Sequence, residues 1–562
     1  MTTAMQPGGS GSEGGRHLRR DVGMIGLLFA GVGSIIGSGW LLGAFNASKI
    51  AGPAAVFSWL IAGVMIILIG LTYAELGTMF PVSAGVIRFP HYAFGPFASY
   101  MMGWINWFAA AVVAPVEVEA VLQYATYYLP FLTNKDTTLS LPWGYLIAVL
   151  LLALFCVVNV LGVRHFARLN NVLVWWKIVV IVLVVIALFV LAFTVTGGNA
   201  SGGADNFSSH SFAPTGLGGI FSAIATAGIT FSYLGFRQGI ELAGETDNPH
   251  RNVPVAVIGS VAISATIYIA LQLAFTFALP ASVVDKTNGW LGLAFNGDSS
   301  PLAGVALLLG AGWLAKLLFF DAVISPGDTG LIYTTITSRL GYAMGRNGNA
   351  PAGVAKLNRN GVPWVATLIT FVLGLVIFLP FPSWQKLVSL VTSATVLSFG
   401  SGPLAYAALR RSLPDQPRPF RLPGRDVIAF LAFFSSNMII FWTGWTTNWK
   451  FFVAVLIGLA LLGVFKATRQ VTAPNFEWRA GAWILPWLGG LAVISFLGNG
   501  EEENGGINLL GTLPGIVVTL IWSAIIYAFA VKVRLTGDKV RAIIAKTPHD
   551  EVAVEEPKIG RY

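Results

Sequence analysis

The sequence predicts an all-helical protein that crosses a membrane many times, and three observations indicate this class. Of the 562 residues, 55% are hydrophobic and only 10% are charged, whereas soluble domains carry about 25% charged residues. The mean hydropathy is +0.73. The apolar residues form long continuous runs, most of which reach the roughly 20 residues that a helix needs to cross the hydrocarbon. This composition excludes an ordinary soluble enzyme, a disordered chain and a collagen-like fibre.

Fourteen apolar segments are predicted to span the membrane. They lie at about residues 22–48, 54–79, 97–128, 142–162, 169–196, 216–240, 253–279, 303–340, 363–380, 385–409, 427–446, 450–466, 480–498 and 507–531. Each is expected to be a helix, because a spanning segment must satisfy its own backbone hydrogen bonds. Strands of a membrane barrel would instead alternate apolar and polar residues.

The basic residues predict the orientation of the chain. With the N-terminus in the cytoplasm, 26 of the 34 Lys and Arg residues fall on the cytoplasmic side. The remaining eight are external Lys49, Lys135, Lys286, Lys386 and Lys450, and Lys177, Arg237 and Lys316 within spans. We therefore expect a plasma-membrane protein with both termini in the cytoplasm: a disordered segment at 1–21 and a tail at 532–562. The net charge of +9 thus reflects topology and does not indicate a nucleic-acid partner.

Motifs for cofactors and catalysis are missing from the sequence. The single cysteine, Cys156, allows neither an intrachain disulfide nor a metal cluster. No Gly-rich phosphate loop ending in Gly-Lys-Ser/Thr and no His-Glu-x-x-His zinc motif occurs. We expect no catalytic residues, no metal and no cofactor.

The first and sixth predicted spans are unusually rich in glycine, at 31–39 and 228–236. Each glycine costs a helix about 1 kcal/mol relative to alanine. The two spans are five apart, so they run in opposite directions. Glycines can also serve close helix packing. Interrupted helices at matching positions of two inverted halves, however, are typical of the binding site of a secondary transporter.

Breaks in these two spans would create a site for a zwitterion. A break at Ser34–Gly39 frees N–H groups and exposes a positive helix end, which suits a carboxylate. A break near Phe231–Leu234 frees carbonyl oxygens, which suit an ammonium group. An α-amino acid carries both groups. The residues expected to bind it are Ser34, Ile35, Gly37, Ser38, Gly39, Phe231, Ser232, Tyr233 and Leu234.

Four motifs in order resemble one family. Residues 31–39 resemble the first-span motif of the amino acid–polyamine–organocation (APC) transporters. Residues 231–254 resemble the sixth span of this family and the loop that follows it. Residues 338–348 resemble the end of the family's eighth span, and residues 414–424 resemble the loop after its tenth span. The family often has an acid where this chain has Arg237, and twelve spans are commoner than fourteen.

The resemblance covers about residues 20–425 and implies the LeuT-like fold. That fold has two inverted five-helix repeats, here at about 22–196 and 216–411. About four peripheral helices would follow within 412–531.

Charged residues inside spans are candidates for ion coupling, since they are costly in a membrane. Lys177 matches a lysine that many APC members carry, which implies sodium-independent transport with Lys177 as a fixed cation or proton carrier. Interfacial snorkelling is the alternative. Glu117 and Glu119 point about 200° apart on a helix, so at least one faces the bundle. Asp321 in the eighth span is a further candidate, and structural pairing is the alternative for all three acids.

Arg237 and Glu241 lie one helical turn apart at the inner end of the sixth span, where they can form part of an inner gate or an ordinary surface ion pair. The sequence thus predicts a secondary active transporter of amino acids, coupled to protons or to exchange. Its expected partners are an amino acid or amine, protons and the lipid bilayer. A polyamine or amine carrier, with Glu117 or Glu119 as the acid at the site, and a non-transporting amino-acid sensor are the alternatives.

Overall fold

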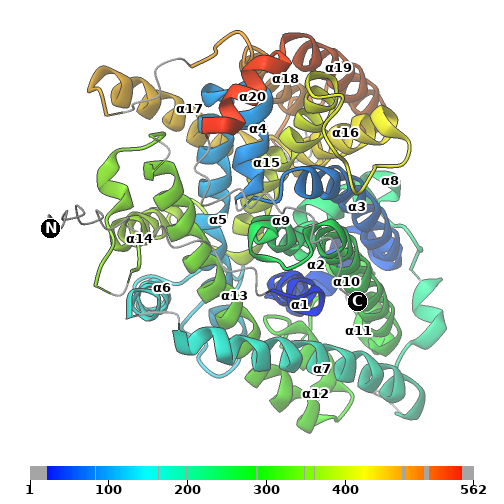
Figure 1. The fold of residues 1–562 in the computed structure, drawn as a ribbon. Coiled ribbons are helices and arrows are strands. Elements are labelled where there is room, and N and C mark those ends of the chain that lie inside the picture. Colours follow the sequence, from blue (N-terminus) through cyan, green and yellow to red (C-terminus); the bar gives the residue numbers. More distant parts are fainter. Residues whose placement is uncertain are drawn as a thin grey trace, which may run out of the picture.

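The computed structural model describes residues 22–82, 84–161, 164–195, 200–208, 210–286, 289–295, 297–346, 348–359, 361–470, 476–498 and 505–546, without the side chains of 164–171. Over these residues the regular elements are helices, and three isolated β-bridges accompany them. The helices pack side by side as a bundle (Figure 1). The predicted all-helical class is therefore confirmed. The expected N-terminal segment 1–21 and the end of the expected tail, 547–562, lie outside the described residues.

Each of the fourteen predicted segments coincides with one helix or with a broken pair. The helices are α1 (Met24–Ile35) with α2 (Gly39–Ala51), α3 (Ala55–Met79), α5 (Pro96–Ala125), α6 (Trp143–Leu161), α7 (Arg164–Thr194), α8 (Gly216–Thr226) with α9 (Gln238–Glu241), α10 (Pro249–Ala278), α12 (Pro301–Leu308) with α13 (Gly312–Arg346), α14 (Trp364–Phe378), α15 (Trp384–Ser412), α16 (Arg425–Thr443), α17 (Trp445–Ala467), α18 (Ile484–Leu497) and α19 (Thr512–Val533). Among the described residues, nine helical stretches are long and apolar enough to cross a membrane, or ten if the bent pair in 216–241 counts as one.

Shorter elements lie between these helices. They are α4 (Gly85–Phe94), α11 (Ala281–Lys286), α20 (Gly537–Lys546) and the 3₁₀ turns η1 (Gly52–Ala54), η2 (Gly203–Phe207), η3 (Phe231–Arg237), η4 (Ala243–Glu245), η5 (Trp290–Gly292) and η6 (Ala352–Ala355). The sequence analysis did not predict α4 and α20, because both mix charged and apolar residues and neither forms a continuous apolar run.

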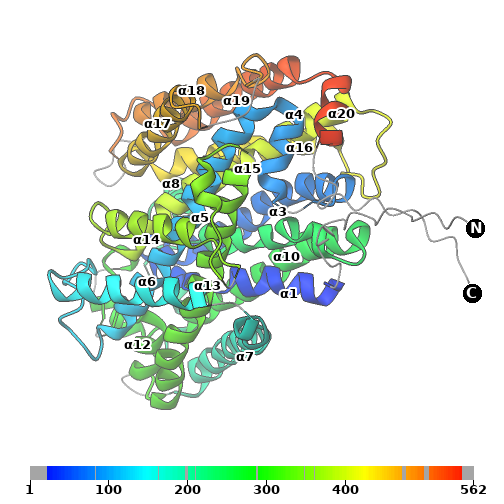
Figure 2. The same cartoon turned by 60° about the vertical axis from the view of Figure 1, so that its left-hand side comes forward.

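Glycines hold α1, α3 and α10 together as one packed group. On α3, Gly63, Gly70 and Gly77 recur every seven residues and so lie on one face. A Cβ atom on Gly70 or Gly77 would come within 3.0 Å of a valine of α10, and one on Gly31 of α1 would lie 3.0 Å from Ser260 of α10. Small residues at such contacts let membrane helices approach closely. Figures 1 and 2 both show the three helices side by side.

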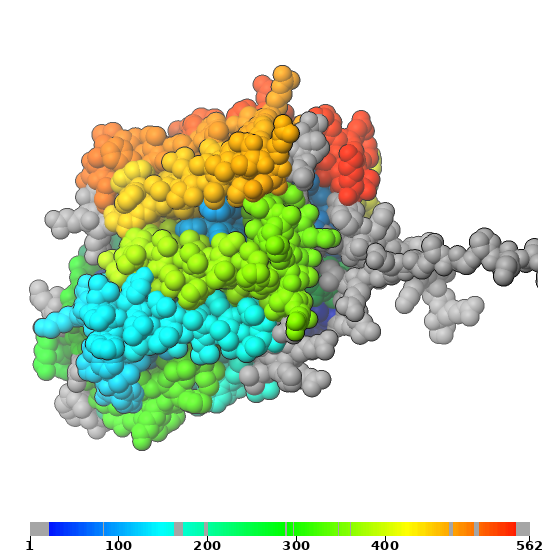
Figure 3. Space-filling model, turned by 90° about the vertical axis from the view of Figure 1, so that its left-hand side faces the viewer, coloured from blue at the N-terminus to red at the C-terminus, as the bar shows by residue number. Residues whose placement is uncertain are grey.

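A second packed group consists of α5, α6, α13 and α14. Gly330 of α13 faces the ring of Phe155 on α6, and Gly374 of α14 lies against both α6 and Pro115 of α5. Helix α15 contacts both groups: Tyr73 of α3 donates to its backbone, and its Ser398 donates to Asn106 of α5. Figure 3 shows one face of the molecule, on which α17, α14 and α6 follow one another.

We call the side of the bundle on which α1 begins the inner face. The Val22 amide donates to the Glu245 carbonyl there, at 3.1 Å. The Leu535 amide, just before α20, donates to the Ala93 carbonyl at the end of α4. Its own carbonyl accepts a bond from Ser412, the last residue of α15. The starts of α1 and α20 and the ends of α4, α9 and α15 therefore share this face (Figure 2).

Candidate functional site

Both glycine-rich spans are broken, as the sequence predicts. Helix α1 ends at Ile35 and α2 begins at Gly39. In the sixth span, α8 ends at Thr226 and the chain continues as the 3₁₀ turn η3 from Phe231, with a bend of 47°. Gly228 adopts a φ of +89° at this bend, a conformation that a side chain would strain. The second interruption therefore begins a few residues before the predicted Phe231–Leu234, which lie within the 3₁₀ turn.

The two breaks lie in direct contact. A Cβ atom on Gly235 would collide with the backbone of Ile35, and one on Gly39 with the side chain of Ser232. All nine residues predicted to bind substrate are buried, and the most exposed side chain, that of Phe231, is only 8% exposed. The structure thus brings the two halves of the predicted site together and closes them from solvent.

The amide that was predicted to bind a substrate carboxylate holds a carboxylate of the protein itself. The Ser38 amide donates to Oε2 of Glu117, on α5, at 2.9 Å. A Cβ atom on Gly37 would lie 2.6 Å from the other carboxylate oxygen of Glu117, so a side chain at this position would displace the carboxylate. The Ser38 hydroxyl accepts a bond of 2.8 Å from the indole N–H of Trp384 on α15. Glu117 therefore faces the bundle and the first break.

Lys177 of α7 lies beside the same break. Its Nζ atom is 2.6 Å from Oδ2 of Asp328 on α13, and both side chains are fully buried. The same nitrogen donates to the Gly33 carbonyl at 3.1 Å and to Thr329 Oγ1 at 3.0 Å. The Thr329 hydroxyl in turn lies 3.3 Å from the Ile36 carbonyl. Snorkelling to the interface is therefore wrong for Lys177, because its ammonium group is bound inside the bundle.

Asp328 is a site residue that the sequence analysis did not include among the coupling residues. It lies in the middle of α13, two residues after Pro326, and is 2% exposed. Its position in an apolar span could have identified it from the sequence, since acids inside spans are buried only when they are paired. The choice of Lys177 as its partner, however, depends on how α7 and α13 pack.

The other two acids predicted for coupling, Asp321 and Glu119, form no hydrogen bond with Lys177 among the described residues. Asp321 accepts bonds of 2.8 Å from the indole of Trp176 and the hydroxyl of Ser325, both through Oδ1. Glu119 is 2% exposed, and neither of its carboxylate oxygens has a hydrogen-bond partner among the described residues. Glu117 and Glu119 thus diverge around α5, as their spacing predicts.

The predicted gate pair is present and is not an ordinary surface ion pair. Arg237 lies 3.9 Å from Glu241, and their side chains are 1% and 11% exposed. The guanidinium group lies over the ring of Tyr333 on α13, 5.9 Å from its centroid. The Glu241 carbonyl accepts a bond from the Ala84 amide, just before α4. This arrangement links η3 and α9 to α13 and α4 on the inner side of the breaks.

A family model described as amino acid permease matches residues 22–485. The chain belongs to the amino acid permease family. The resemblance to APC transporters is therefore confirmed, and with it the class of multi-pass membrane transporter. As a member of this family, the permease moves amino acids.

Relatives match this permease along almost its whole length. It is 36% identical to the glutamate/serine transporter AimA of Bacillus subtilis, over 92% of this chain and 94% of the relative. It is 34% identical to the aspartate-proton symporter of the same organism, over 92% of this chain and 96% of the relative. A branched-chain amino acid permease, BcaP of Bacillus subtilis, is 27% identical over 80% and 94%.

Proposed function

We propose that this permease is a proton-coupled, sodium-independent secondary transporter of acidic and small polar amino acids. It would act in the plasma membrane with both termini in the cytoplasm, so that the inner face is cytoplasmic. The inverted repeats at 22–196 and 216–411 would form its core, and the helices within 412–531 would be peripheral. The observation that carries the proposal is the fully buried Lys177–Asp328 pair against the backbone of the first break. The names of the two most similar relatives reported above support it.

Lys177 supplies the positive charge at the first break. Its ammonium group donates a hydrogen bond to the Gly33 carbonyl oxygen, so a further cation is not needed to bind this oxygen. Asp328 balances the charge and offers a second group that can accept a proton. A buried ion pair is tolerated when both partners are present, and it is costly when either is neutralised alone. Proton uptake here would therefore alter the contact between α7, α13 and the break.

Glu117 links proton uptake to substrate binding. A substrate carboxylate that approaches the Ser38 amide must replace the carboxylate of Glu117, and two ionised carboxylates at one amide repel each other. Protonation of Glu117 removes this repulsion. Substrate and proton would then enter the site together, which is symport. Glu119 and Asp321 remain proposals for the path of the proton, since both are buried acids within spans.

Arg237 supports an acidic substrate over a polyamine. Its guanidinium group is buried three residues after Leu234, and its Nε and Nη2 atoms have no hydrogen-bond partner among the described residues. Its ion pair with Glu241 is long, at 3.9 Å. A guanidinium fork matches a carboxylate in shape and charge, and it repels a cationic side chain.

The transport proposal predicts uptake driven by acid outside. In proteoliposomes without sodium, an inward proton gradient should increase the initial uptake of glutamate, aspartate or serine about tenfold over vesicles without a gradient. Putrescine and lysine should neither enter nor compete. Binding of these amino acids without any uptake would favour the sensor alternative, and a strict sodium requirement would contradict the proposed coupling.

The substrate proposal predicts a selective defect in Arg237→Gln. Loss of one charge-assisted interaction, worth about 1.5–3 kcal/mol, should raise the KM for glutamate and aspartate by roughly tenfold to a hundredfold. Serine uptake by the same variant serves as the internal control, because it reports correct folding and turnover. An equal loss of serine uptake and glutamate uptake would show that Arg237 does not bind the side chain of the substrate.

A further inference from the structure

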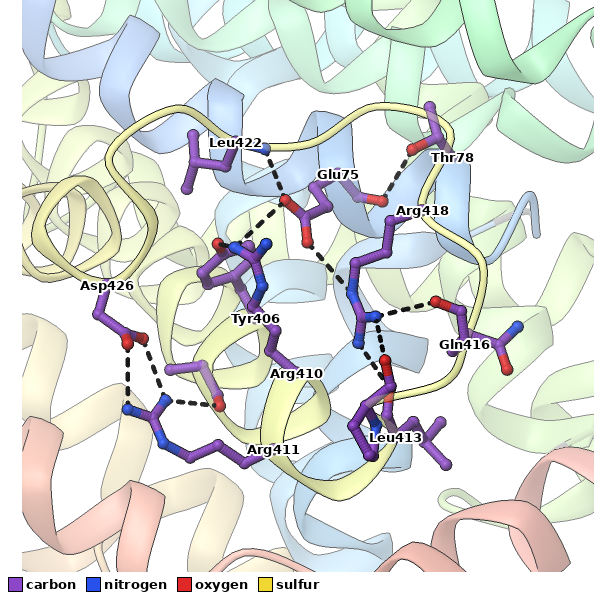
Figure 4. Close-up of polar contacts among 12 residues, drawn as sticks. Glu75, Thr78, Tyr406, Arg410, Arg411, Leu413, Gln416, Arg418, Leu422 and Asp426 are labelled. Atoms are coloured by element: carbon purple, nitrogen blue, oxygen red, sulfur yellow. Dashed lines mark hydrogen bonds and ion pairs between the residues drawn. The ribbon is translucent and has the colours of Figure 1, made fainter.

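A cluster of charges lies on the inner face, away from the two breaks. At its centre is Glu75, near the end of α3, whose side chain is 1% exposed. The chain between α15 and α16, residues 413–424, wraps over this carboxylate (Figure 4). The Leu422 amide donates to Oε2 of Glu75 at 2.6 Å, and Nε of Arg418 lies 3.4 Å from Oε1. Arg410, on the last turns of α15, adds a longer ion pair at 3.8 Å.

The 413–424 connection is ordered by the same arginine that contacts Glu75. Arg418 donates to the carbonyls of Leu413, Pro414 and Gln416, at 2.6 Å, 2.9 Å and 2.9 Å. These bonds fold the connection around one guanidinium group, as Figure 4 shows for Leu413 and Gln416. A single acid on α3 therefore holds both the end of α15 and the connection that follows it.

The opposite end of α15 reaches the substrate site. Trp384, its first residue, donates to the Ser38 hydroxyl and packs edge-on against Phe231, with ring centroids 6.3 Å apart. Helix α15 has 29 residues, so it is about 43 Å long. It is one continuous helix, with Pro403 inside it, whose first residue lies at the breaks and whose last turns lie near Glu75.

We propose that Glu75 is a positioning residue for transport, which fixes the inner end of α15 to α3 and thereby keeps Trp384 over the two breaks. The proposal rests on the proposed transport function, since α15 closes the site between turnovers. Without the carboxylate, the Leu422 amide loses its charged acceptor and Arg418 and Arg410 lose their ion-pair partner, so α15 is free to tilt. Because α3 packs with α1 and α10, the contacts of Glu75 transmit the movement of these helices to α15.

The test combines Glu75→Gln with a matched control. Arg411→Gln removes the neighbouring pair of Arg411 with Asp426, whose side chains are 39% and 48% exposed, and exposed pairs contribute little. In Glu75→Gln we expect the maximal uptake rate per folded molecule to fall about tenfold, with substrate Kd within about twofold of the unmodified protein. Arg411→Gln should match the unmodified protein in both. A parallel fall in binding and rate would indicate a merely structural role and overturn the proposal.

A measurement of access to the first break tests the positioning role of Glu75 independently of the proposed transport function. In a Cys156→Ala background, a cysteine placed at Ser34 reports access to the first break. Glu75→Gln should speed its reaction with a water-soluble maleimide about fivefold, and Glu75→Asp, which keeps the charge, should partly restore the slow rate. If Glu75→Gln does not fold, Arg418→Gln breaks the same contact from the connection and carries the same expectation.

The outcomes are distinct. Equal labelling rates with and without the substitution would overturn the positioning role, whatever the substrate. Faster labelling in a protein that transports none of the tested amino acids would retain the positioning role and overturn the proposed function.

Discussion

Replacing Lys177 with methionine is expected to abolish proton-driven uptake, with a fall of about a hundredfold or more. The variant loses the ammonium group that binds the Gly33 carbonyl and leaves Asp328 buried without its cation. Breaking a buried pair from one side costs about 3–5 kcal/mol, so the free energy of unfolding should fall as well. Initial uptake and thermal unfolding of the purified variant measure the two effects.

A double variant separates the two roles of the pair. Lys177→Met with Asp328→Leu removes both charges, and apolar replacements of a buried pair are often neutral for stability. We expect the double variant to regain thermal stability and to remain inactive in proton-driven uptake. Recovery of uptake together with stability would show that the pair only holds helices together.

Gly37→Val is expected to abolish substrate binding, lowering affinity at least about a hundredfold. The new Cβ would lie 2.6 Å from Oε1 of Glu117 and 3.1 Å from the side chain of Thr329, so the branched side chain displaces both from the break. The Ser38 amide would then face a valine in place of a carboxylate. Equilibrium binding of labelled glutamate to the purified variant gives the affinity.

The control for this variant is Gly26→Val on α1, the helix that precedes the break. Gly26 is exposed, and its nearest neighbour would be a Val22 methyl at an ordinary 3.6 Å, so binding and uptake should be unchanged. Near-normal glutamate binding by a folded Gly37→Val protein would place the carboxylate site elsewhere.

The sequence was sufficient to predict the helices of the fourteen apolar segments and the two breaks, and to favour the burial of Lys177. Each of these follows from local features: continuous apolar runs, clustered glycines and a charge inside a span. The contacts of the site were not predictable in the same way. Glu117 meets Ser38 across 79 residues, and Lys177 meets Thr329 across 152. Such pairings depend on which faces of distant helices pack together, and no local pattern specifies that.

Glu75 illustrates the same limit. It is one acid near the end of an apolar helix, and its partners lie more than 330 residues later, on the last turns of α15 and in the charged connection that follows. The sequence analysis singled out that connection only as a family motif. Its role as a cover for a buried carboxylate depends on the packing of α3 beside α15, and Figure 4 shows the contacts that result.

The most direct test of proton coupling is the internal pH of sealed vesicles. Proteoliposomes that contain the permease and a trapped pH-sensitive dye, in sodium-free buffer of equal pH on both sides, should acidify inside when glutamate is added outside. Vesicles with Lys177→Met should show no change. Entry of labelled glutamate into the unmodified vesicles without acidification, or only after sodium is added, would contradict the account.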